Sequence, residues 1–249
     1  GAPSAESILD KYIEAAGGAQ RLAGLTSFVG KGTSVSFGGF GGGGDVELVA
    51  QAPDKRSTII IFKEETGRGD QIRAYDGRTG WLRTPLNVLG EFQLTRTDLD
   101  GARVDAQLSF PGQIKQILTN LRTGPPTTIA DLPAPTSQSV LQQGVALDQT
   151  HVVDVVQGIG PRNLLVTLYF DRQTGLLLRE LRYGSSPIGR IPTQIDFADY
   201  RDVNGIKFPF RITFAWLDGR DSIVLNNITT NVAIDAAKFG RPAPLKPSR

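Results

Sequence analysis

Catalysis and metal binding depend on a few side-chain types. In this sequence few of them occur at the spacings that such sites need. His151 is the only histidine, Asp154 follows it by three residues, and cysteine is absent. A nucleophilic triad would also need an activated serine, but neither G-x-S-x-G nor S-x-x-K occurs. Without cysteine there is no disulfide, thiolate nucleophile or covalent haem. We therefore predict no catalytic residue, metal site or cofactor, and interpret His151 as a surface residue.

Two further patterns could suggest chemistry. Six glycines lie between Phe37 and Asp45. A phosphate-binding loop needs glycines that lead into a helix, whereas these lead into a strand-like segment. We interpret the run as a hairpin tip, with a mobile lip beside an opening as the functional alternative. Glu64 and Glu65 are adjacent, so on an extended chain they point to opposite faces and form a poor acid/base pair.

Composition excludes several classes of protein. The 249 residues carry a formal charge of +2 from 27 basic and 25 acidic side chains. Nucleic-acid binding typically needs a basic stripe with interleaved aromatic residues, and the sequence has none. The sequence contains no apolar run of about 18 residues, so no transmembrane segment is predicted. The small, polar opening GAPSAES is typical of residues that follow a removed signal peptide. We expect an exported protein whose signal peptide is absent from this chain.

The hydrophobic pattern predicts mostly β structure. N-terminal helices are expected within 4–25, a helical insert at about 86–121, and a proline-rich connector at 123–138. About twelve strands are expected, roughly five before the insert and seven after it, without helices between successive strands. We predict a single large antiparallel sheet over 1–249, with the insert lying across it. The alternative is that the connector divides two domains.

The most aromatic strand face lies between Ile206 and Trp216. Its six large apolar side chains occupy every second position, so they share one face. Pro209 lacks an N–H and is expected at a bulge or an edge. A large open sheet has more concave area than a few short helices can cover, so part of it should face a ligand. The alternative for each residue is ordinary core.

The predicted site has two parts. The short insert helices belong to the less stable part of the fold and form the predicted lid. The predicted lid residues are Ile114, Ile117, Leu118 and Leu121. The predicted cavity lining is Tyr75, Trp81, Phe92, Phe197, Phe208, Phe210, Ile212, Phe214 and Trp216.

Four phrases occur in a characteristic order: KYIEAAGGAQRLAGLTS, AYDGRTGWLRTP, LYFDRQTGLLLREL and DYRDVNGIKFPF. Together with the order of helices and strands, they resemble the LolA-like superfamily of periplasmic lipoprotein carriers and outer-membrane lipoprotein-sorting proteins. The first and last phrases are most similar to acidobacterial envelope proteins, in which a related domain can follow multihaem cytochrome segments. The resemblance covers nearly the whole chain, but its motifs are turn and packing residues.

The resemblance implies an incomplete β-barrel whose concave face, closed by helices, holds an acyl chain or another lipophilic group. It implies a periplasmic or outer-membrane-associated protein whose partner is a lipophilic ligand or a lipoprotein. We match no residue to the charged latch of the lipoprotein carrier, so the resemblance favours binding of a lipophilic group over lipoprotein transfer itself. The alternatives are a noncatalytic interaction or sensing domain with an envelope protein partner, and an enzyme.

Overall fold

The computed structural model describes residues 2–37, 43–62, 69–85, 90–131, 149–216 and 219–247, which form four α-helices and thirteen strands. The helices are α1 (Ala5–Ala16), α2 (Ala19–Ala23), α3 (Arg96–Leu108) and α4 (Ile114–Ile117), with 3-10 turns η1 (Pro111–Gln113), η2 (Pro161–Asn163) and η3 (Ala236–Lys238). The strands before α3 are β1 (Ser27–Phe37), β2 (Gly44–Gln51), β3 (Lys55–Ile61), β4 (Gln71–Tyr75), β5 (Gly80–Arg83) and β6 (Glu91–Gln93). Those after α4 are β7 (Thr119–Ala130), β8 (Thr150–Ile159), β9 (Leu165–Asp171), β10 (Leu177–Ser186), β11 (Gly189–Val203), β12 (Ile206–Trp216) and β13 (Gly219–Thr230).

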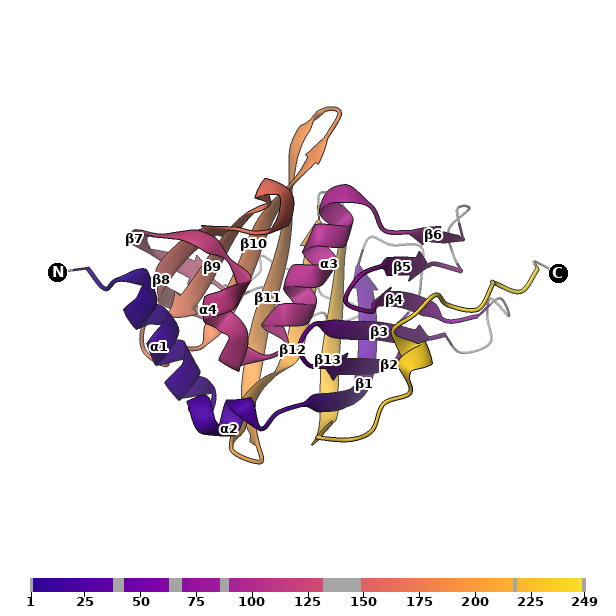
Figure 1. Cartoon of the computed structure of the whole chain (residues 1–249), viewed down its shortest axis with the longest axis horizontal. Coiled ribbons are helices and arrows are strands. Elements are labelled where there is room, and N and C mark those ends of the chain that lie inside the picture. The colour runs from indigo at the N-terminus through magenta and orange to yellow at the C-terminus, as the bar shows by residue number, and fades with distance from the viewer. Residues whose placement is uncertain are drawn as a thin grey trace.

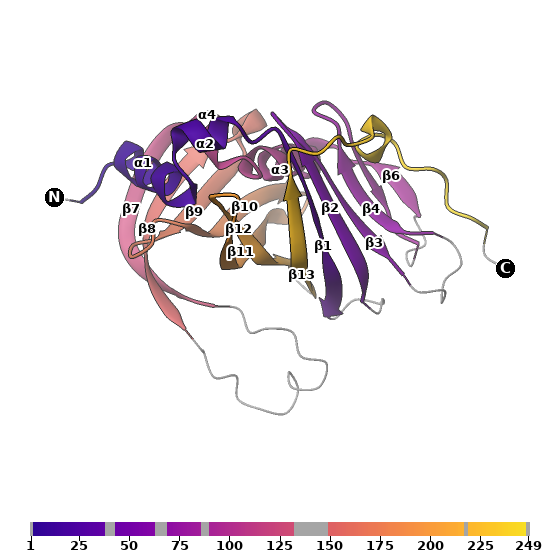
Figure 2. The same ribbon diagram turned by 90° about the horizontal axis from the view of Figure 1, so that it is seen from below.

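All thirteen strands belong to one antiparallel sheet, in the order β6-β5-β4-β3-β2-β1-β13-β12-β11-β10-β9-β8-β7. The sheet curves strongly, but its described edge strands β6 and β7 do not pair with each other (Figure 2). The helices lie on the same side of this curve, with α3 crossing the middle of the sheet (Figure 1). The predicted antiparallel sheet, curved into an incomplete barrel with helices on its concave face, is confirmed.

Helix α1 forms where the sequence supplies both a cap and an apolar stripe. The Ser4 hydroxyl oxygen accepts a 3.1 Å hydrogen bond from the Ser7 N–H, and Gly17 ends the helix with a φ of 149°. A side chain at Gly17 would bring its Cβ to 2.8 Å from the Gly205 carbonyl oxygen. The glycine therefore lets α1 approach the β11–β12 turn, while its buried residues Ile8, Leu9, Tyr12 and Ala16 enter the core.

The segment between β6 and β8 differs from the sequence-based expectation. The main helix of the insert expected at about 86–121 is α3, and after it the chain forms only the turn η1 and the short α4 before β7 begins. Residues 123–130, expected in the proline-rich connector, belong to β7. Pro125 and Pro126 are tolerated because they lie in an edge strand, at a register shift between Gly124 and Thr127. The rest of the expected connector, 132–138, lies outside the described residues.

Strand β12 changes its neighbours along its length. It pairs with β11 from Ile206, but its pairing with β13 begins only at Arg211. Pro209 therefore lies where β12 has one described neighbour, as its missing N–H requires. Phe208, in this stretch of β12, belongs to the main core, where its ring centroid lies 5.1 Å from that of Phe28 on β1.

Candidate functional site

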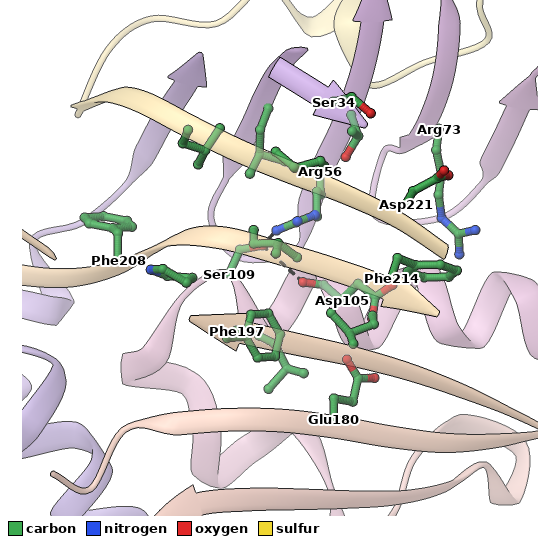
Figure 3. A pocket seen from close by; sticks show the side chains of 18 of the residues that line it. Ser34, Arg56, Arg73, Asp105, Ser109, Glu180, Phe197, Phe208, Phe214 and Asp221 are labelled. Atoms are coloured by element: carbon green, nitrogen blue, oxygen red, sulfur yellow. Dashed lines mark hydrogen bonds between the residues drawn. The ribbon is translucent and has the colours of Figure 1, made fainter. Parts of the chain in front are cut away.

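A cavity of about 790 Å³ lies between the concave face of the sheet and α3 (Figure 3). Its walls come from β1 to β5, from β10 to β13 and from helices α1 and α3. Most of the lining residues are apolar: Phe28, Leu48, Ile60, Phe62, Ala74, Leu82, Ala102, Leu108, Pro111, Leu177, Ile195, Phe197, Phe208, Pro209, Ile212, Phe214, Ile223, Leu225 and Ile228. This size and composition are typical of cavities that bind small organic molecules.

Five of the predicted lining residues meet in this cavity: Tyr75, Phe197, Phe208, Ile212 and Phe214. Trp81 does not line it, because neighbouring residues of a strand alternate and Leu82 takes the inward position of β5. The Trp81 ring instead lies 4.8 Å from the guanidinium carbon of Arg241. Phe92 packs against a separate buried cluster that includes Leu94. The side chain of Trp216 lies outside the described part of the structure.

The alternation expected along β12 is interrupted near Phe210. On the paired strand β11, Phe197 and Tyr200 both line the cavity although they are three positions apart. Residues on one face of a regular strand are an even number apart, so an irregularity must lie between them. Asp199 supplies it with a φ of 54°. Phe210 is buried outside the cavity lining, with its ring 4.6 Å from the Arg201 guanidinium carbon.

The predicted lid residues also lie outside the cavity lining. Ile114, Ile117 and Leu118 are buried in the main core, and Leu121 packs against that core from β7. The helical residues that line the cavity are earlier in the chain: Ala102, Asp105 and Leu108 of α3, then Ser109 and Pro111. Helix α3 therefore forms most of the helical cover of the cavity, to which α1 adds Tyr12.

A buried charge cluster in the cavity wall could not be foreseen from the sequence. The Arg182 side chain donates to Asp105 Oδ1 at 2.6 Å and to Glu180 Oε1 at 3.0 Å. Glu180 is fully buried and Arg182 is only 5% exposed. Gly101 leaves room for this arginine, because a Cβ at Gly101 would lie 2.5 Å from Arg182 Nε. The cluster joins β10 to α3 across the cavity wall.

Glu180 is expected to make stability depend on pH. Burial, followed by the neighbouring Asp105 charge, raises the pKa of its carboxyl from 4.5 to about 8. Between these values the folded protein keeps a proton that the unfolded chain loses, so stability falls as pH rises through this window. The neutral amide of Glu180→Gln should remove this contribution. Relative to the variant, the wild type should lose about 1.4 kcal/mol of unfolding free energy per pH unit at most.

Urea unfolding of both proteins between pH 5 and 8 measures this difference. Parallel pH profiles for wild type and Glu180→Gln would contradict a raised Glu180 pKa. The expected sign is specific, because a carboxyl with a lowered pKa would stabilise the protein as pH rises.

His151 has partners that the sequence did not reveal. Its Nε2 lies 3.1 Å from Asp131 Oδ1, and its Nδ1 lies 3.3 Å from Asp171 Oδ2.

The described residues contain no group of three or more histidine, cysteine or acidic side chains arranged to hold a metal ion. None of the helices in the described ranges is long and apolar enough to cross a membrane.

Comparisons with known proteins agree with the architecture. The sequence matches no protein-family profile and no curated protein. The structure is similar to a LolA superfamily protein from Nitrosomonas europaea, with a TM-score of 0.51 and 14% identity over 96% of this chain and 99% of that one. The chain has a LolA-like fold. A DUF1329 family protein from Desulfovibrio piger is also similar, with a TM-score of 0.50 and 9% identity over 94% of this chain and 96% of that one.

Proposed function

We propose that this LolA-like protein binds a lipophilic ligand, such as a lipid or a lipoprotein acyl chain, in the cavity beneath α3 and carries it in the bacterial cell envelope. The observation that supports the proposal most is the cavity of about 790 Å³ with predominantly apolar walls. Each methylene group that moves from water into such a site contributes about 0.8 kcal/mol. A chain of several methylenes would therefore bind well without a catalytic group.

Helix α3 is the proposed cover of the ligand. Its buried face includes Ala102 and Val104, while Asp105 reaches the charge cluster. The small side chain of Ala102 lines the cavity and leaves room beside the sheet. The predicted lid residues of α4 would then support α3 through the core rather than contact the ligand.

A noncatalytic envelope interaction or sensing domain is the alternative function for this fold. The phrases at the N-terminus and in the β11–β12 hairpin resemble those of acidobacterial envelope proteins, and this resemblance supports an envelope role of either kind. Mass spectrometry of organic extracts from natively purified protein separates the two functions. Copurified lipid or lipopeptide supports carriage, whereas extracts without either, and no uptake of a fluorescent hydrophobic probe, support the interaction domain.

Two phenylalanines on β12 provide a matched test of the cavity. Phe210→Ala should lower the free energy of unfolding by about 3–5 kcal/mol, because it empties a closed core position. Phe214→Ala should cost less, because the Phe214 ring already borders the cavity, but it should weaken binding of the hydrophobic probe. Chemical unfolding and probe titration measure the two effects. Equal losses of stability, with probe binding unchanged in both variants, would count against a ligand at this wall.

A further inference from the structure

Two arginines project from neighbouring strands into the cavity, and both lie close to its apolar wall. Arg56 is on β3 and Arg73 is on β4, where Arg73 pairs directly with Thr58. Arg56 and Thr58 are two residues apart and share a face, so the two arginines are diagonal neighbours, about 7–8 Å apart, within reach of long side chains. Both line the cavity, and Figure 3 shows both side chains directed into it.

Their hydrogen-bonding capacity is mostly unused. The Arg56 Nη1 group donates to Ser109 Oγ at 2.7 Å. The Arg73 guanidinium carbon lies 5.6 Å from the centre of the Phe214 ring. Within the described ranges, neither arginine has a carboxylate within 4.0 Å, whereas Arg182 contacts two. Each guanidinium carries five N–H donors, so several donors on each face the cavity.

The surrounding charges leave an excess of positive charge. Desolvation by burial lowers the pKa of both Arg56 and Arg73, so the cavity is costly for these cations. Arg182 already binds the Asp105 carboxylate and the Glu180 carboxyl, and the raised pKa of Glu180, about 8, keeps that carboxyl mostly neutral at pH 7. Two other charged residues line the cavity, Asp221 and Lys207, and Lys207 lies 3.9 Å from Asp202. An entering anion would therefore be attracted most strongly to the pair Arg56 and Arg73.

We infer that the cavity takes an amphiphile with an anionic head group, a carboxylate or a phosphate, which lies between Arg56 and Arg73 with its apolar tail along Phe197 and Phe208. The inference rests on the proposed lipophilic ligand and adds its charge and its orientation. Guanidinium groups suit this role because their donors match the oxygens of carboxylates and phosphates in pairs. Phe208 lies at the end of the labelled residues opposite Arg73, which gives the tail an apolar path (Figure 3).

The test compares three ligands with the same tail: decanoate, decan-1-ol and decyl phosphate. Their affinities for the purified wild-type chain are measured at pH 7.5 by displacement of a fluorescent hydrophobic probe. At least one anion should bind about ten- to a hundredfold more tightly than the alcohol. Hydrogen bonds between charged groups change an affinity by about this factor. The anion that binds more tightly identifies the head group, and either result supports the inference.

Arg73→Met and Arg56→Met remove the charges while keeping a long apolar stem. In each variant the affinity for the anion, relative to that for decan-1-ol, should fall about tenfold or more. Arg73→Met is the safer variant for folding, because no described residue hydrogen-bonds its side chain. Arg78→Met is the matched control, since Arg78 is exposed in the β4–β5 turn.

The outcomes separate this inference from the proposed function. If the alcohol binds as tightly as both anions, or if the preference persists in both arginine variants, the anionic head group is wrong while the lipophilic cavity stands. If the chain binds none of the three ligands and no probe, the proposed function fails together with the inference.

Discussion

Replacing Arg182 by methionine should lower the free energy of unfolding by about 3–5 kcal/mol, because it leaves buried carboxyl groups without their cation. The guanidinium contacts Asp105 at 2.6 Å and Glu180 at 3.0 Å, and the exposed fractions of the Arg182 and Glu180 side chains are 6% and 0%. Urea unfolding at pH 7 measures the loss.

The matched control is Arg201→Met. Arg201 lies 2.8 Å from Asp199, a distance similar to those in the buried cluster, but this pair is 52% and 43% exposed. Water and salt screen such a pair, so its removal should change stability far less. The double variant Arg182→Met with Glu180→Gln should recover little of this loss at pH 7, because burial and the Asp105 charge already keep Glu180 protonated there. Equal effects of Arg182→Met and Arg201→Met would contradict the stabilising role of the buried cluster.

Filling the cavity should have the largest effect on ligand binding. Ile223→Trp places a larger side chain on β13 where Ile223 lines the cavity, and should weaken binding of a hydrophobic probe at least tenfold, a loss of about 1.4 kcal/mol. Stability should change little, because the added volume enters empty space instead of overpacking a closed core. Fluorescence titration of the probe measures this effect.

The neighbouring residue supplies the control for Ile223→Trp. Val224 is also partly exposed, but it lies on the other face of β13 and does not line the cavity. Val224→Trp should therefore leave probe affinity unchanged. Unchanged probe binding in Ile223→Trp, with both variants folded, would place the ligand elsewhere or show that the cavity binds none.

The sequence predicts the fold well because its signals are local. Alternation of apolar and polar side chains has a period of two wherever a strand borders a core, so the strands from Lys55 to Ile61 and from Ile206 to Trp216 could be recognised without their partners. Helix α1 carries its own cap and stripe in the same way. The segment Thr119–Ala130 could not be recognised, because its prolines are acceptable only at an edge and the position of the edge is a property of the sheet.

The cavity lining could be predicted only in part. The face shared by Phe208, Ile212 and Phe214 follows from their spacing, and all three line the cavity. Phe210 has the same spacing but lies elsewhere, because Asp199 on the paired strand interrupts the regular alternation. Aspartate adopts a positive φ more readily than most residues, so the sequence permits this conformation at Asp199. Nothing nearby in the sequence requires it.

The polar groups of the cavity were decided by tertiary structure alone. Arg182 and Asp105 are 77 residues apart and meet because α3 crosses the concave face beside β10. Arg56 and Arg73 look like ordinary polar positions of half-buried strands until the curvature of the sheet turns their face inward. The sequence by itself therefore determined which segments are strands and which of their faces are apolar, because backbone periodicity is local. Only the tertiary structure decided which charges the cavity encloses, because burial depends on residues that are distant along the chain.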